Sequence, residues 1–89
     1  MAHSNSAKKR VRQNITRRAR NRWRIRAMRE AMKDFADKIA NGSNEEATAS
    51  FRNAAAVIDR TAQRGVIHRN QAARRKSRLN KHLKAKLSA

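Results

Sequence analysis

Arginine and lysine are the residues of this sequence whose number and spacing point to chemistry. They total 24, against six aspartate and glutamate residues, which gives the 89-residue chain a formal net charge of +18. Guanidinium and ammonium groups at this density bind phosphate oxygens, and such an excess of one sign concentrates polyanions around the chain. The expected partner is therefore a nucleic acid or an anionic membrane surface, and a small acidic substrate would not require this charge.

Other kinds of reactive site are absent from the sequence. The chain has no cysteine, and its three histidines, His3, His68 and His82, are too scattered to form a zinc cluster. There is no paired carboxylate in a basic setting, no nucleophile with a base, and no glycine-rich phosphate loop. We therefore expect neither an enzyme nor a metal or cofactor site.

We also expect no membrane span and no secretory leader. No apolar run approaches the roughly 18 residues that cross a bilayer, and the first thirty positions contain no apolar segment of signal-peptide type. The Arg-rich, acid-free segment 1–29 resembles a transit peptide in composition, but the same bias returns at the other end, where no transit peptide would lie. We expect a chain that stays soluble inside a cell.

Positive and negative residues are segregated along the chain. Residues 1–29 hold 11 basic and no acidic residues, and residues 60–89 hold 10 basic and no acidic residues. The middle segment, residues 30–59, holds all six acids against three basic residues. A merely solvated surface would mix the two signs. The distribution instead favours two basic binding ends joined by a slightly acidic middle.

These residues must be positioned by helices. The sequence has no proline, and its two glycines, Gly42 and Gly65, are expected to end helices in left-handed geometry. We predict three helices, at about residues 6–41, 44–64 and 68–86, the first roughly 50 Å long. Ser43 and Glu46 form a capping box at the start of the second helix, with the carboxylate expected to reach back to the amide of Ser43.

Apolar residues at helical spacing predict how the helices pack. The fold class is all-α, a single domain over residues 1–89 in which a three-helix bundle leaves the long N-terminal helix projecting beyond the core. Only 17 apolar residues are larger than alanine, so we expect the free protein to be partly unfolded and to need its partner. The predicted stripes are Ile25, Met28, Ala31, Met32, Phe35 and Ile39 on the first helix, Ala47, Phe51, Ala54, Ala55, Ile58 and Ala62 on the second, and Ala72, Leu79, Leu83 and Leu87 on the third, with Val66 and Ile67 at its entrance.

The first helix loses its apolar seam near Ile25, so about twenty residues before it have no bundle to pack on. On a helical wheel, Arg22, Arg26 and Arg29 fall within about 80° of Arg18, while Arg17, Arg20 and Arg24 lie between about 200° and 260°. Cations therefore surround much of this rod, as a crevice between nucleic-acid helices would require. The predicted phosphate contacts here are Lys8, Lys9, Arg10, Arg12, Arg17, Arg18, Arg20, Arg22, Arg24 and Arg26.

Trp23 lies nearly opposite the apolar stripe on the same wheel. Its indole could stack on an unpaired base or a sugar, as aromatic side chains do in RNA recognition. It could equally lie along its own helix over neighbouring alkyl stems. With aromatic residues at 3% of the chain, an RNA-binding module built on a platform of stacking aromatics is excluded.

Residues 64–79, R-G-V-I-H-R-N-Q-A-A-R-R-K-S-R-L, together with S-A-K-K-R at residues 6–10, resemble bacterial small-subunit ribosomal protein twenty. The resemblance covers essentially the whole chain. It implies a three-helix bundle embedded in the small ribosomal subunit of a bacterial or organellar ribosome, binding ribosomal RNA directly and early in assembly. The turn N-G-S-N and Trp23 depart from the family pattern. The matching motif residues are Ser6, Lys8, Lys9 and Arg10 at the N-terminus, and His68, Asn70, Arg74, Lys76, Ser77 and Arg78 in the third helix.

His68 and Asn70 lie at the start of the third helix, where a side chain can cap exposed amides and a phosphate can approach the positive end of the dipole. Arg69, Arg75 and Lys81 of the same basic segment complete the predicted RNA contacts. We expect few or no protein partners, no membrane and no small-molecule substrate. Two alternatives are a histone-like DNA-binding protein, for which apolar wedge residues are lacking, and a cationic membrane-active helix, for which residues 6–24 have too weak an apolar face.

Overall fold

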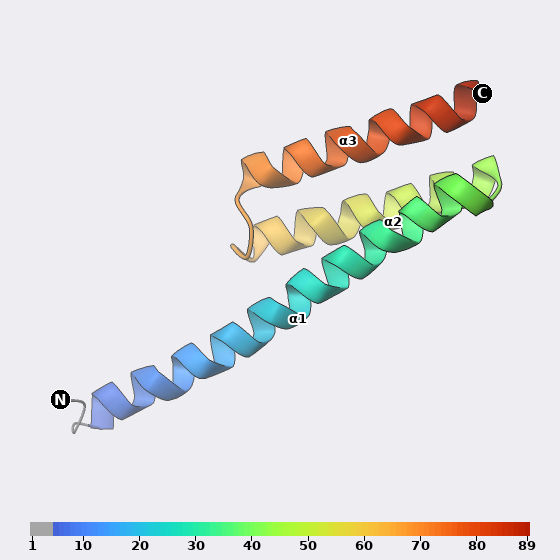
Figure 1. Ribbon diagram of the computed structural model, residues 1–89. Helices are drawn as coiled ribbons and strands as arrows, with labels where there is room; N and C mark the ends of the chain where they lie inside the picture. The colour runs from blue at the N-terminus through green and yellow to red at the C-terminus, as the bar shows by residue number, and fades with distance from the viewer. Residues whose placement is uncertain (1–4) are drawn as a thin grey trace.

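A computed structural model of the chain describes residues 5–89, and within this range every regular element is a helix (Figure 1). Helix α1 spans Asn5–Asn41, α2 spans Asn44–Gln63 and α3 spans Arg69–Ser88. The predicted all-α class is confirmed, and the helices begin and end within two residues of their predicted bounds. The third helix begins at Arg69 because His68 is extended and serves as its N-cap.

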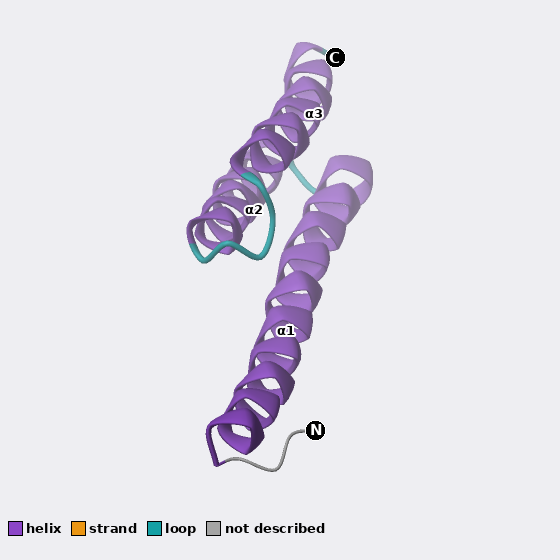
Figure 2. Cartoon of the chain, turned by 90° about the vertical axis from the view of Figure 1, so that its left-hand side faces the viewer, coloured by secondary structure: helices purple, strands orange, loops and turns teal. Residues whose placement is uncertain are grey.

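Helix α2 lies between the other two and packs against both (Figures 1 and 2). It runs antiparallel to α1 across the Gly42 turn, and the rings of Phe35 and Phe51 meet there with their centroids 5.9 Å apart. Helix α3 then folds back along α2 and touches α1 over a much smaller surface. The core is therefore a layer on either side of α2, with Phe35, Met28 and Ile58 as its largest fully buried side chains.

Two polar residues and one leucine depart from the predicted apolar stripes. Ser50 and Thr61 of α2 are buried, whereas the predicted Ala55 and Ala62 are half-buried. Both hydroxyls are satisfied, since Ser50 Oγ donates to Asp34 Oδ2 at 2.7 Å and Thr61 Oγ1 donates to the Val57 carbonyl at 2.7 Å. Leu87 is 46% exposed. Leu87 lies in the last turn of α3, beside the first turns of α2, which leave much of its side chain uncovered.

The two glycines end their helices differently. Gly65 has a φ of 76°, and its turn is a Schellman motif in which Val66 N donates to the Thr61 carbonyl and Gly65 N to the Ala62 carbonyl. Gly42 is not left-handed, contrary to prediction. Its amide donates to the Lys38 carbonyl at 2.9 Å, and a Cβ at Gly42 would approach that oxygen to 2.9 Å. Glycine is required there by this close approach of the backbone.

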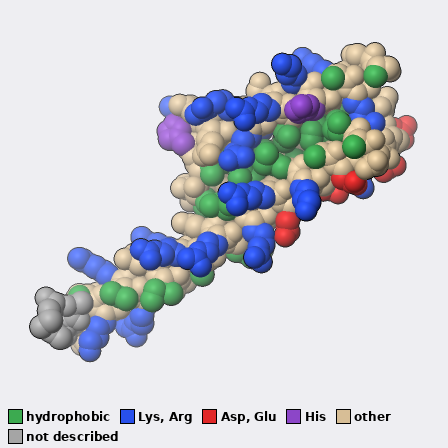
Figure 3. Space-filling model, viewed as in Figure 1, with side chains coloured by type: hydrophobic (Ala, Val, Ile, Leu, Met, Phe, Trp, Pro, Cys, Tyr) green, Lys and Arg blue, Asp and Glu red, His purple; other side chains and the backbone are tan. Residues whose placement is uncertain are grey.

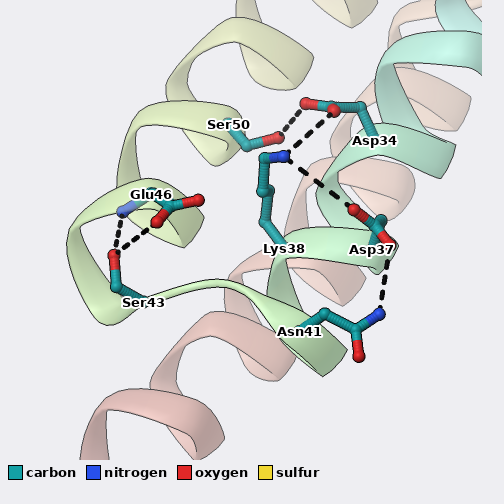
Figure 4. A network of polar contacts seen from close by, with 7 residues as sticks. All are labelled: Asp34, Asp37, Lys38, Asn41, Ser43, Glu46 and Ser50. Atoms are coloured by element: carbon teal, nitrogen blue, oxygen red, sulfur yellow. Dashed lines mark hydrogen bonds and ion pairs between the residues drawn. The ribbon is translucent and has the colours of Figure 1, made fainter.

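Polar contacts fix the turn between α1 and α2 (Figure 4). Ser43 Oγ accepts from Glu46 N at 3.1 Å, as the capping box predicts, but the Glu46 carboxylate accepts from the Ser43 hydroxyl at 3.3 Å instead of from the Ser43 amide. Lys38 Nζ lies 4.0 Å from Asp34 and 3.8 Å from Asp37, and Asn41 donates to Asp37. The acidic middle of the chain is thus largely engaged within the bundle.

Helix α1 continues far beyond this bundle and gives the molecule its elongated shape (Figure 1). Its principal extents are 63 × 22 × 15 Å, and its radius of gyration is 17.6 Å, against about 12 Å for a compact domain of this length. All residues from 8 to 23 are exposed, and the first residue of α1 that is fully buried is Met28. The predicted projecting helix is confirmed.

Candidate nucleic-acid interface

The projecting part of α1, residues 5–24, forms a rod whose surface is basic. Its nine cations are exposed except for the half-buried Arg24, and over the described residues none of them lies within ion-pair distance of a carboxylate. On the face drawn in Figure 3, Lys and Arg side chains lie along both edges of the rod, while the acidic side chains gather toward the far end of the bundle. The cations of the rod therefore have no counterion within the described part of the protein.

One hollow, of about 820 Å³, lies on the face of α1 where the rod meets the bundle. It brings together Arg22, Arg26 and Arg29, as the helical wheel predicts, and adds Lys33, with Glu30 as the single acid in its lining. Arg18, from the same side of the wheel, lies outside this lining. Four cations around one shallow surface suit a stretch of phosphate backbone more than a single small anion.

A second hollow, of about 400 Å³, opens at the start of α3. The ring of His68 caps the helix, because its Nδ1 accepts from Asn70 N at 3.1 Å, and the first turn contains no acid. This hydrogen bond fixes the orientation of the imidazole beside the positive end of the helix dipole. The lining combines the predicted His68, Asn70, Arg74, Arg75 and Arg78 with Gln71, which sequence reasoning missed.

The remaining predicted residues of α3 are placed differently. Arg69, Ser77 and Lys81 are exposed outside this lining. Lys76 Nζ forms an ion pair with Asp59 Oδ1 at 2.8 Å and so joins α3 to α2. Arg75 Nη1 donates to Met32 Sδ at 3.8 Å, and its Nε is buried without a hydrogen-bond partner among the described residues. Lys76 and Arg75 therefore already serve contacts within the protein.

Sequence reasoning predicted Arg24 as a phosphate contact but missed Arg60 and Arg64, which the fold brings next to it. Arg24 of α1 meets Arg60 and Arg64 of α2 around a hollow of about 270 Å³ that also includes Trp23. The antiparallel packing of the two predicted helices could have indicated this cluster. If Phe35 lies opposite Phe51, residues near Ile25 lie opposite residues near Thr61. The basic surface thus continues from the rod onto the end of α2.

Nothing in the described range offers a metal site or a membrane span. Residues 5–89 contain no group of three or more His, Cys, Asp or Glu side chains placed to hold a metal ion, and His3 lies outside this range. In the same part of the chain no helix combines the length and the apolar character needed to cross a bilayer. Fold and surface together define a class, that of small all-helical proteins with a projecting, strongly basic helix.

Comparison with known proteins identifies the family within this class. The sequence model of the family described as Ribosomal protein S20 matches residues 2–84. Relatives named small ribosomal subunit protein bS20 from Syntrophobacter fumaroxidans, Psychrobacter sp. and Shewanella piezotolerans are 46%, 48% and 47% identical over 85 residues. The aligned region covers 96% of this chain and 99%, 97% and 97% of the three relatives. The chain therefore belongs to the ribosomal protein S20 family, which agrees with the resemblance seen in its sequence and with the expectation of a non-enzymatic protein.

Proposed function

We propose that this protein is a structural component of the small ribosomal subunit in the cytoplasm and binds small-subunit ribosomal RNA directly. The projecting rod of α1 is the observation that carries the proposal. A helix without a core beneath it and with unpaired cations on several sides gains its stabilisation from phosphates around it. The name shared by the relatives supports the location in the small subunit.

The proposed contacts lie on two elements, and each has its own role. Cations of the rod neutralise phosphates of the RNA helices on either side, while the hollow at the start of α3 holds a fixed arrangement of phosphate and sugar. Lys76 would exchange its ion pair with Asp59 for a phosphate. The proposed RNA-binding residues are Ser6, Lys8, Lys9, Arg10, Arg12, Arg17, Arg18, Arg20, Arg22, Arg24, Arg26, His68, Arg69, Asn70, Arg74, Arg75, Lys76, Ser77, Arg78 and Lys81.

Direct binding is tested with the full chain and naked small-subunit ribosomal RNA. Hydroxyl-radical footprinting should show a confined set of protected nucleotides with no other protein present, because we propose few or no protein contacts. A requirement for a second ribosomal protein would contradict this.

Salt dependence tests the phosphate contacts. If about a third of the 21 basic residues outside the middle segment meet phosphates, roughly seven are neutralised, and log Kobs should fall with log salt concentration with a slope near −5 to −6. A slope shallower than about −2 would contradict the electrostatic proposal. Equal affinity for random duplex DNA at physiological salt would instead favour a histone-like DNA-binding function.

A further inference from the structure

Trp23 is the largest exposed apolar side chain among the described residues, and it is not part of the hydrophobic core. Its exposed fraction is 68%, and no hydrogen bond occupies its indole N–H over residues 5–89. It lies on α1 beside the end of α2, since it lines a hollow together with Arg60 and Arg64. A large amphipathic ring kept in solvent at such a junction points to a binding role.

The surroundings of Trp23 indicate the chemistry of the partner. Between Trp23 and the last turns of α2 lies the hollow of about 270 Å³, whose lining also includes Ala27, Val57 and Thr61. This volume is below the range of about 300 to 1,000 Å³ typical of pockets for larger ligands, so it suits one planar group. The apolar side chains of Ala27 and Val57 and the indole face together offer that group a surface on which to stack.

The charges around this hollow are all positive. Arg24, Arg60 and Arg64 are its only ionisable lining residues, and within residues 5–89 none of them forms an ion pair. Asp59, the acid next to Arg60 in sequence, is held by Lys76 at 2.8 Å. Three unpaired guanidinium groups around an aromatic face are complementary to a planar base attached to a phosphate backbone. A hydrophobic protein side chain would contact Ala27 and Val57 but leave the three arginines without a counterion.

We infer that Trp23 is a base-stacking residue: an unpaired purine of the small-subunit ribosomal RNA stacks on its indole in this hollow, with Arg24, Arg60 and Arg64 holding the flanking phosphates. The inference rests on the proposed RNA-binding function and adds to it a subsite that reads an unpaired nucleotide. The rod supplies contacts to any phosphate backbone. The Trp23 subsite instead requires a base that has left its helix, because a paired base has no free face to offer.

Trp23 is the only tryptophan of the chain, so the tryptophan fluorescence comes from this residue alone. In the complex of the full-length protein with naked small-subunit ribosomal RNA, Trp23 emission should be strongly quenched and protected from acrylamide. Trp23→Ala should weaken binding about 5- to 150-fold, the range expected for one base–aromatic stack. Trp23→Phe should restore most of the affinity and Trp23→Leu little of it, since leucine has bulk but no π face.

A matched control is Ile15→Ala, which removes another exposed apolar side chain of α1, 62% exposed, away from this hollow. It should leave the affinity within about twofold. Circular dichroism of every variant should match the parent, because neither side chain is in the core. In addition, Trp23→Ala should expose one purine to chemical modification that the parent protects, at a position unpaired in the RNA.

The outcomes separate this inference from the proposed function. If the parent binds ribosomal RNA specifically but Trp23 stays open to acrylamide and Trp23→Ala binds as the parent does, the stacking subsite is refuted and RNA binding stands. If the parent shows no specific binding, the proposed function itself fails. Protection of Trp23 that arises only in the assembled subunit, and not on naked RNA, would assign the hollow to another ribosomal protein and would also refute the inference.

Discussion

Gly65 is the residue at which the path from α2 to α3 is decided. Its φ of 76° lies in the left-handed region, which costs an ordinary L-residue roughly 1–2 kcal/mol, and a Cβ there would meet no atom within 4 Å. Gly65→Ala should therefore lower the free energy of unfolding by about that amount through backbone strain alone. Gly65→Asn should lose less, because asparagine tolerates this region. Equal losses for both variants in denaturant unfolding would contradict this explanation.

Ile58 and Asp59 are neighbours in sequence that stabilise α2 in different ways. Ile58 is fully buried, so Ile58→Ala should cost about 2–5 kcal/mol of unfolding free energy.

Asp59 forms an ion pair with Lys76 of α3, but the side chains of Asp59 and Lys76 are 50% and 37% exposed. Asp59→Asn should therefore cost no more than about 1 kcal/mol and lose even that difference at high salt. Thermal unfolding of the two variants at low and high salt checks both statements.

At the scale of the elements, α1 and the start of α3 differ in what surrounds their cations. The arginines at residues 10–20 of the rod lie on an exposed helix with no helix packed against it, whereas those of α3 line a hollow next to a capped helix end. Contacts of the first kind hold any polyanion, and contacts of the second kind require a particular arrangement of phosphates. Affinity and specificity should therefore separate between the two helices.

Two sets of substitutions test this separation. Glutamine at Arg18, Arg22 and Arg26 should weaken binding to specific and competitor RNA alike and make the salt slope shallower by about 3. The second variant combines Asn70→Ala, Arg74→Gln and Arg78→Gln with His68→Asn, which retains an N-cap acceptor for α3. It should lower the preference for ribosomal RNA at least about tenfold. Proportional losses for both RNAs in both variants would leave bulk charge as the sole determinant.

The whole molecule combines a small core with a long unsupported helix. Residues 8–20 are all exposed, and their like charges repel one another along the rod. In the free protein their amides should exchange with solvent almost as fast as those of an unfolded chain. Amides of α2 and of α1 around Met28 to Phe35 should be protected by the core, and RNA should protect the rod as well. Strong protection of residues 8–20 without RNA, measured by hydrogen exchange, would contradict this.

Periodicity and charge made the architecture predictable from the sequence. Apolar residues at intervals of three and four predicted α1 and α2. Before Ile25 this spacing is lost, which predicted the projecting rod. The two glycines predicted where the first two helices end. The candidate interface on the rod was predictable for the same reason, since an exposed helix keeps its cations wherever the sequence places them. The motif at residues 64–79 indicated the family directly.

Tertiary structure decided what depends on more than one helix. Ser50 and Thr61 are buried because α2 is enclosed from two sides and its hydroxyls find acceptors, which an apolar pattern cannot reveal. Gly42 is required by the position of the Lys38 carbonyl and not by a left-handed turn. The hollow of Trp23 with Arg24, Arg60 and Arg64 joins residues about forty positions apart, so its existence follows from the packing of α1 on α2. Local sequence determines which residues a helix presents, but only packing determines which helices share a surface.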